Sequence, residues 1–191
     1  MIACFCLWVV YYGLHSFLAS QPVKDWFHLR LGKHFLWYRL GYNGMAILSF
    51  AAVWLFQRQL NAQVLWESPN WMMGLAGSLF LAGAWVAFLG LRQYDLGAFM
   101  GIRPILAPSS HELAQDGVHQ WVRHPLYSGA TLILLAYLSY SPSLPHLIFV
   151  GVSLGYLVVG IHWEEQKLIA EFGDEYRAYR RRVKALIPFV Y

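Results

Sequence analysis

Two short polar clusters lie next to two apolar runs in the second half of the chain. Arg123-His124-Pro125 precedes the run 126–140, and Glu164 with Glu165 follows the run 147–163. Carboxylates beside apolar helices are costly unless they are solvated, paired or functional. If the two runs form an antiparallel hairpin, Arg123 can pair with either acid at one end of it. The alternative is that both acids only mark a helix start, where negative charge is favourable.

The composition indicates that these clusters belong to a membrane protein. Of 191 residues, 13% are charged, 58% are hydrophobic and 17% are aromatic, whereas an average soluble domain has roughly 25% charged residues. This balance excludes a disordered chain and argues against an ordinary soluble domain. We read the net charge of +4 as membrane sidedness, with the lipid bilayer as partner and no nucleic acid. The length predicts a single domain, 1–191.

The apolar runs predict an all-α, polytopic fold of about five transmembrane helices. A span needs about 20 mostly apolar residues, and the fourth run is short by that measure. The segment Ser141–Pro145 reads as the turn between the fourth and fifth runs. The five predicted spans are Met1–Ala19, Leu36–Phe56, Trp71–Leu91, Leu126–Tyr140 and Leu147–Trp163.

Basic residues set the predicted orientation, because they accumulate in cytoplasmic segments. With five spans, every Lys and Arg except Arg58 falls on one side. This places the N-terminus outside and the C-terminus in the cytoplasm, in what we take to be a bacterial inner membrane.

The tail after Trp163 has the pattern of a cytoplasmic amphipathic helix. Apolar residues recur every three or four positions, and they are Leu168, Phe172, Tyr176, Tyr179, Val183 and Leu186. Such a helix could lie on lipid headgroups or fold over a cofactor as a lid.

Several common sites have no support in the sequence. Cys4 and Cys6 form no metal-ligand spacing with a second pair, and the eight histidines give no haem attachment motif. No metal is therefore predicted. The phosphate-binding and nucleophile-elbow glycine motifs are also absent.

The polar clusters lie within two longer motifs. The runs GVHQWVRHPLYSG (117–129) and WEEQKLIAEFGDEYRAYRRRVKALIPF (163–189) resemble the isoprenylcysteine carboxyl methyltransferase superfamily, which includes phospholipid N-methyltransferases. LHSFLASQPVKDWF (14–27) and FLGLRQ (88–93) look most like its methanethiol S-methyltransferases.

The resemblance implies S-adenosylmethionine bound at the cytoplasmic face, by a cofactor-binding part at about 92–191. Arg123 and Glu165 are candidate catalytic residues that would favour a thiolate acceptor, since the thiolate is the nucleophile. The implied cofactor-binding residues are His111, Glu112, Leu113, Ala114, His119, His124, Pro125, Leu126, Tyr127 and Glu164.

The implied acceptor is a small apolar thiol or a lipid-like molecule. Carboxyl-methylating relatives carry a substrate-binding Arg four residues before the first Glu, and this chain has Gly160 there. Two alternatives stay open: an NADPH-dependent reductase like the sterol reductases, and a non-catalytic protein on the same scaffold. Leu126 and Ala130 stand where such reductases have Asn and an acid.

Overall fold

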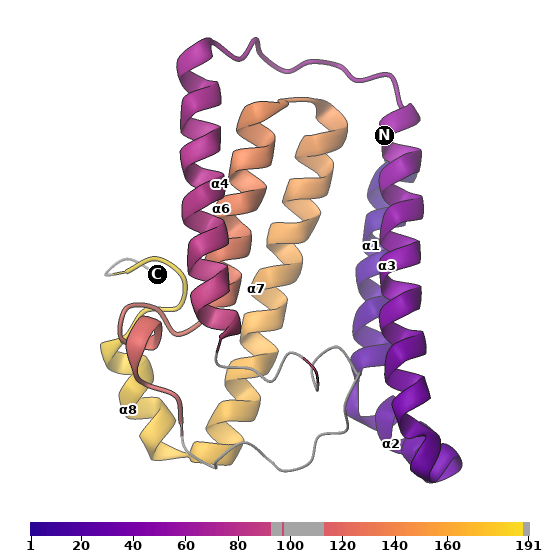
Figure 1. Ribbon diagram of the computed structural model, residues 1–191, viewed down its shortest axis with the longest axis vertical. Helices are drawn as coiled ribbons and strands as arrows, with labels where there is room; N and C mark the ends of the chain where they lie inside the picture. Colours follow the sequence, from indigo (N-terminus) through magenta and orange to yellow (C-terminus); the bar gives the residue numbers. More distant parts are fainter. Residues whose placement is uncertain (93–96, 98–112, 189–191) are drawn as a thin grey trace. The chain divides into compact units, whose positions relative to one another are not determined.

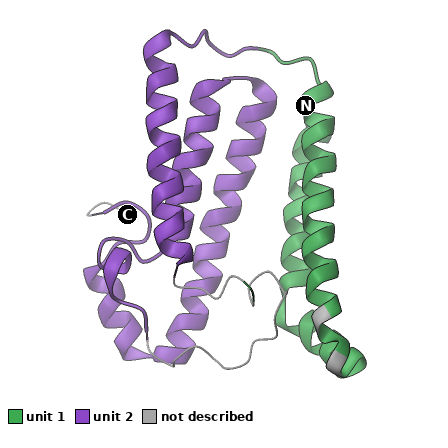
Figure 2. Ribbon diagram, in the orientation of Figure 1, with its two compact units in different colours: residues 1–63, 95–108 green, residues 64–94, 109–191 purple. Residues whose placement is uncertain are grey.

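The structure is a computed structural model that describes residues 1–92, 97 and 113–188. Regular structure in these residues is helical, apart from two isolated β-bridges. The chain divides into two compact units, unit 1 (residues 1–63 and 95–108) and unit 2 (64–94 and 109–191), which Figure 2 colours green and purple.

Unit 1 is built on two long helices, α1 (Ile2–Ala19) and α3 (Phe35–Gln59), joined by α2 (Gln21–Leu31) and the short η1 (Gly32–His34). Ser20 is the N-cap of α2, and Pro22 lies in its first turn, a position that proline suits. This helix was not predicted. Aromatic rings fill the contact between α1 and α3, with Trp8 fully buried against Phe50.

Unit 2 contains α4 (Asn70–Leu91), η2 (Gly117–Gln120), α6 (Pro125–Tyr140), α7 (Leu144–Phe172) and α8 (Asp174–Arg182). Glycines bring α4 and α6 into backbone contact: a Cβ added at Gly129 would lie 2.5 Å from the Gly83 carbonyl oxygen and 2.6 Å from the Ala87 nitrogen. The helices α6 and α7 form the predicted antiparallel hairpin (Figure 1).

The end of unit 2 that carries the α6–α7 turn is tied to the segment before α4. The Leu65 N–H donates to the Pro142 carbonyl oxygen at 2.8 Å, and Val64 bridges to Ser143. We call the opposite end of the hairpin, where α6 begins, its inner end.

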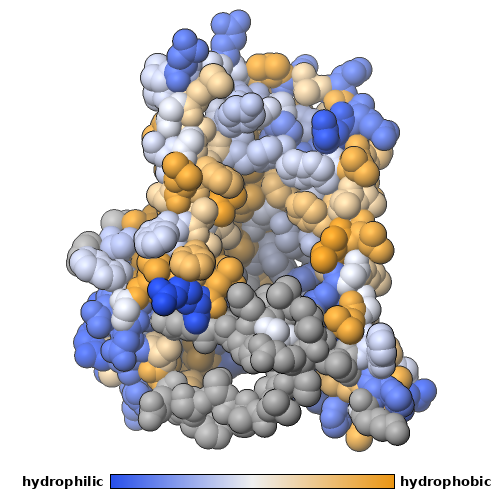
Figure 3. Space-filling model, in the orientation of Figure 1, coloured by the Kyte–Doolittle hydropathy of each residue, from blue (hydrophilic) through white to orange (hydrophobic). Residues whose placement is uncertain are grey.

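The chain is an all-α, polytopic membrane protein. Within the residues that the structure describes, four helices are long and apolar enough to cross a membrane, namely α1, α3 from Trp37, α4 and α7. The helix α6, at 16 residues, is shorter than these. Large apolar side chains are exposed along α4, among them Phe80, Leu81 and Trp85, and hydrophobic residues cover its middle in Figure 3. A lipid environment explains this exposure.

Three details of the predicted helices were wrong. Helix α7 starts at Leu144, so Pro145 lies in its first turn and not in the loop. It also continues to Phe172, so Glu164 and Glu165 do not mark a helix start. The amphipathic tail is not one helix, because the chain breaks at Gly173, whose φ of 56° favours glycine.

Candidate active site

A buried ion pair joins the start of α6 to α7 at the inner end of unit 2. The Arg123 Nε donates to Glu165 Oε1 at 3.0 Å, and its Nη2 donates to the same oxygen. The side chains are only 8% and 7% exposed. The pair expected from the hairpin is thus formed, and Glu165 is the partner of Arg123.

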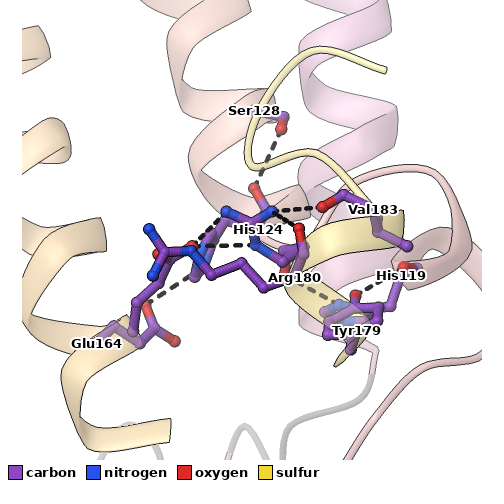
Figure 4. Close-up of polar contacts among 9 residues, drawn as sticks. His119, His124, Ser128, Glu164, Tyr179, Arg180 and Val183 are labelled. Carbon is purple, nitrogen blue, oxygen red and sulfur yellow. Dashed lines mark hydrogen bonds and ion pairs between the residues drawn. The ribbon is translucent and has the colours of Figure 1, made fainter. Parts of the chain in front are cut away.

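Glu165 meets two further nitrogen-bearing side chains. Its Oε2 lies 3.1 Å from the Arg180 Nε of α8, and its Oε1 lies 3.3 Å from the His124 Nε2 (Figure 4). Arg180 is about half exposed, and His124 is buried. Two guanidinium groups on one carboxylate favour its ionised form.

The segment after α8 lies against the residues that begin α6. The Arg123 N–H donates to the Lys184 carbonyl oxygen at 2.8 Å, and the His124 N–H donates to that of Ala185 at 3.1 Å. The Arg123 side chain also donates to the Val183 carbonyl oxygen, and Ser128 Oγ donates to that of Leu186 at 2.7 Å. We call residues 183–186 the C-terminal strap.

His119 completes the contacts around Arg123. Its Nδ1 lies 3.1 Å from the Arg123 carbonyl oxygen; since a carbonyl only accepts, Nδ1 carries the proton. Burial lowers the pKa of His119, which favours the neutral ring. The Tyr179 hydroxyl donates to the His119 carbonyl oxygen at 2.7 Å, and burial raises the pKa of Tyr179 to about 12.

Glu164 has a different environment from Glu165. Its side chain is 37% exposed, and its Oε2 lies 3.7 Å from the His124 Nδ1. This distance exceeds a normal hydrogen bond. Glu164 therefore presents a carboxylate at the inner end that is less enclosed than that of Glu165.

Tyr127 and Gly160 face each other across the hairpin. A Cβ added at Gly160 would lie 3.5 Å from the Tyr127 hydroxyl oxygen. The Tyr127 ring also meets the His124 ring edge-on, with centroids 5.6 Å apart. A side chain larger than Ala at position 160 would thus compete with Tyr127 for space.

Comparison with known proteins decides the family. The family model described as "NnrU protein" matches residues 1–190. The chain belongs to the NnrU family. It is 36% identical over 92% of its length to methanethiol S-methyltransferase of Mycobacterium tuberculosis, covering 72% of that protein.

Other relatives extend this likeness. Methanethiol S-methyltransferase 1 of Bradyrhizobium diazoefficiens is 30% identical over 92% of the chain, which spans only 62% of that relative. Protein-S-isoprenylcysteine O-methyltransferase of Schizosaccharomyces pombe is 24% identical over 97% of the chain and 88% of its own length. No solved structure matches significantly. The resemblance inferred from the motifs is confirmed.

In this NnrU-family chain, the structure brings together most of the residues that the motifs indicated. Arg123, His124, Tyr127, Glu164 and Glu165 meet at the inner end, as described above. Pro125 is buried, where its ring and the Leu126 nitrogen would contact a Cβ at Gly90.

The predicted cofactor-binding residues 111–114 are less closely tied to this site. Leu113 and Ala114 lie in an irregular segment. The next residue, Gln115, donates to Glu175 of α8 at 3.0 Å. His111 and Glu112 lie outside the described residues.

Sequence reasoning missed Arg180 and the strap. Arg180 is one of three consecutive arginines, and nothing in that run distinguishes the one that reaches Glu165. The strap joins Arg123 and His124 through backbone atoms, which leave no residue pattern. The apolar spacing placed Tyr179 on the apolar face of the tail, but it did not predict the hydrogen bond that its hydroxyl donates to His119.

Proposed function

We propose that this protein is an S-adenosylmethionine-dependent membrane methyltransferase that acts on a small apolar thiol or a lipid-like acceptor. The NnrU-family match and the methyltransferase names of its relatives support the activity class. The observation that carries the proposal is the inner end of the α6–α7 hairpin. There His124 lies against Glu165 of the Arg123–Glu165 pair, and Tyr127 and the partly exposed Glu164 lie beside the His124 ring.

These residues fit the cofactor chemically. When bound, S-adenosylmethionine supplies an activated methyl group on a sulfonium. The Glu164 carboxylate can accept hydrogen bonds from an ammonium or hydroxyl group, and the Tyr127 ring offers an aromatic face to a cation or a base. The proposed cofactor-binding residues are His111, Glu112, Leu113, Ala114, His119, His124, Pro125, Leu126, Tyr127 and Glu164.

Arg123 and Glu165 are proposed to serve catalysis through position and charge. Their contacts hold the strap and α8 against the start of α6. Methyl transfer depends mainly on proximity, orientation and exclusion of water. The main contribution of the Arg123–Glu165 pair would therefore be to close the inner end of the hairpin. The positive groups Arg123 and Arg180 would also favour a thiolate over a thiol.

The residue at position 160 is the basis for the proposed chemical class of the methyl acceptor. Gly160 carries no cation for a substrate carboxylate, and the space above it is limited by the Tyr127 ring. We therefore propose that thiols or lipids are methylated in preference to a prenylcysteine carboxylate.

The activity test uses the purified chain in detergent with a labelled methyl donor. Acceptors are methanethiol-type thiols, phosphatidylethanolamine and prenylcysteine, and product is counted in each. Calorimetric titration with S-adenosylmethionine and with NADPH separates a methyltransferase from a reductase. Binding of NADPH alone, or of neither compound, would overturn the proposal; faster prenylcysteine methylation would overturn the acceptor class.

Glu164→Gln tests the site itself. A charge-assisted hydrogen bond is worth roughly 1.5–3 kcal/mol, which is about ten- to a hundredfold in dissociation constant. We expect at least tenfold weaker S-adenosylmethionine binding with unchanged thermal stability of the cofactor-free protein. Glu171→Gln, at an exposed position of the same helix, is the matched control. Equal affinities in both variants would remove Glu164 from the site.

We also propose that residues 1–191 form one domain in a bacterial inner membrane, with the N-terminus outside. The asymmetry of Lys and Arg supports this orientation. Reporter fusions after Gln63 and after Tyr191 are expected on opposite sides. Reporters on the same side would rule out five spans.

A further inference from the structure

A basic cavity lies where η2 meets the C-terminal strap. Val122 and Lys184 form a parallel β-bridge, and beside it is an open cavity of about 200 Å³. A liquid water occupies about 30 Å³, so the space exceeds that of several waters. The lining residues are Gln120, Trp121, Arg182, Val183 and Lys184.

The cations of this cavity differ from two other arginines of α8, Arg177 and Arg180. Arg177 pairs with Asp174 at 2.8 Å, and Arg180 pairs with Glu165. In the part of the chain that the structure describes, Arg182 and Lys184 have no carboxylate within ion-pair distance, and the Arg182 Nη2 donates to the neutral Gln115 Oε1 at 3.1 Å. Among the described residues, the cavity therefore carries two cations without a direct ion pair, while Glu175, which accepts a hydrogen bond from the same Gln115 amide, lies outside its lining.

The cavity is also placed for contact with a membrane surface. Trp121 is 60% exposed and Ile187 is 52% exposed. The C-terminal strap, which directly precedes Ile187 in the chain, accepts a hydrogen bond from Ser128 in the first turns of the apolar helix α6. Tryptophan is enriched at the membrane–water interface. Hydrophilic side chains gather over the adjoining α8, below the hydrophobic band (Figure 3).

We propose that this cavity binds the phosphate of an anionic phospholipid, with Arg182 and Lys184 as its ligands. Trp121 would lie beside the glycerol region, where an amphipathic ring is stable. A basic pocket next to an exposed apolar ring matches a headgroup that is charged and joined to acyl chains. Because the strap forms one wall, the lipid would hold the strap against Arg123 and His124. The proposal does not depend on the methyltransferase activity.

The test measures lipid binding to the full chain in detergent by native mass spectrometry. The probes are dioctanoyl phosphatidylglycerol, dioctanoyl phosphatidylcholine and, separately, inorganic phosphate. We expect saturable phosphatidylglycerol binding, with phosphatidylcholine at least tenfold weaker and no equivalent effect of phosphate. The double variant R182Q/K184Q should weaken phosphatidylglycerol binding by about tenfold or more.

The matched control is K167Q/R177Q, which removes two exposed cations outside the cavity. It should bind phosphatidylglycerol like the wild type. Equal weakening in both double variants would show diffuse attraction and overturn the site. If inorganic phosphate bound the site as strongly as phosphatidylglycerol, the ligand would not be a lipid. Equal binding of phosphatidylglycerol and phosphatidylcholine would also overturn the proposal. If R182Q/K184Q is unfolded by circular dichroism, Trp121→Ala replaces it, with several-fold weaker binding expected and unchanged binding counting against the proposal.

Discussion

Unit 1 joins its long helices through aromatic rings, whereas unit 2 joins α4 to α6 through glycines and closes its inner end with charged side chains. In unit 1, the Phe50 ring of α3 meets the Trp8 and Tyr11 rings of α1 with centroids 5.3 and 5.7 Å apart. In unit 2, Gly83 and Gly129 bring two backbones into contact, and Glu165 lies between two arginines.

These two kinds of contact differ in how strictly they fix geometry. Aromatic pairs tolerate a range of distances and angles, but a glycine contact fails when one carbon is added, and a buried ion pair fails when one charge is removed. The unit that carries the candidate site therefore has the stricter contacts. The proposed methyl transfer would need such a fixed orientation.

The largest effect is expected from Glu165→Gln. The change leaves the nearly buried Arg123 without its counter-charge, and breaking a buried pair costs about 3–5 kcal/mol. Thermal and denaturant unfolding in detergent would measure the loss. Glu171→Gln, which removes an exposed acid from the same helix, should change stability by less than about 0.5 kcal/mol. If both variants unfold alike, the pair does not hold the inner end together.

Gly129→Ala should have the next largest effect. Its new Cβ would meet backbone atoms of Gly83 and Ala87, so the helices α4 and α6 must move apart, at a cost of about 1–3 kcal/mol. The control is Gly155→Ala on α7, where nothing lies within 4 Å of an added Cβ. That change should be neutral or stabilising by up to about 1 kcal/mol. Equal behaviour of the two variants would contradict the backbone contact between α4 and α6.

The sequence predicted those features of unit 2 that depend on composition and short-range spacing. The apolar runs indicated the helices, and the short turn near Ser141 indicated an antiparallel hairpin. That geometry alone placed Arg123 opposite the two acids. It could not choose between Glu164 and Glu165, because adjacent helix residues differ only in the direction they face.

Features that depend on long-range backbone pairing were not predictable in this way. The strap was assigned to a helix because Val183 and Leu186 continue the apolar spacing of Tyr176 and Tyr179. Gly173 interrupts that helix, and the strap pairs instead with Arg123 and His124. In contrast, the start of α2 has a local signal in the sequence, an N-cap serine at Ser20 followed by Pro22, from which this helix could have been predicted.

A smaller effect is expected in unit 1, from the buried polar pair of Trp8 and Gln57. The Trp8 Nε1 donates to Gln57 Oε1 at 2.7 Å, and Gln57 is 1% exposed. Trp8→Phe removes this bond, so unfolding in detergent should become easier by about 1 kcal/mol. Adding Gln57→Leu removes the buried amide and should restore most of the loss. A double variant no more stable than Trp8→Phe would show that the amide has a role beyond this bond.

The smallest effect returns to unit 2 and concerns pH. Burial lowers the pKa of His119 below its ordinary 6.5, so near and below that pH the unfolded chain binds this proton more readily than the folded protein. The free energy of unfolding should therefore fall as the pH drops from 6.5 towards the lower pKa of the folded protein, and should not change on this account at higher pH. His119→Gln keeps an N–H donor for the Arg123 carbonyl oxygen but cannot titrate, so its melting temperature should decrease less on acidification. An unchanged slope in His119→Gln would mean that other groups carry the acid sensitivity and that His119 is not held in its neutral form.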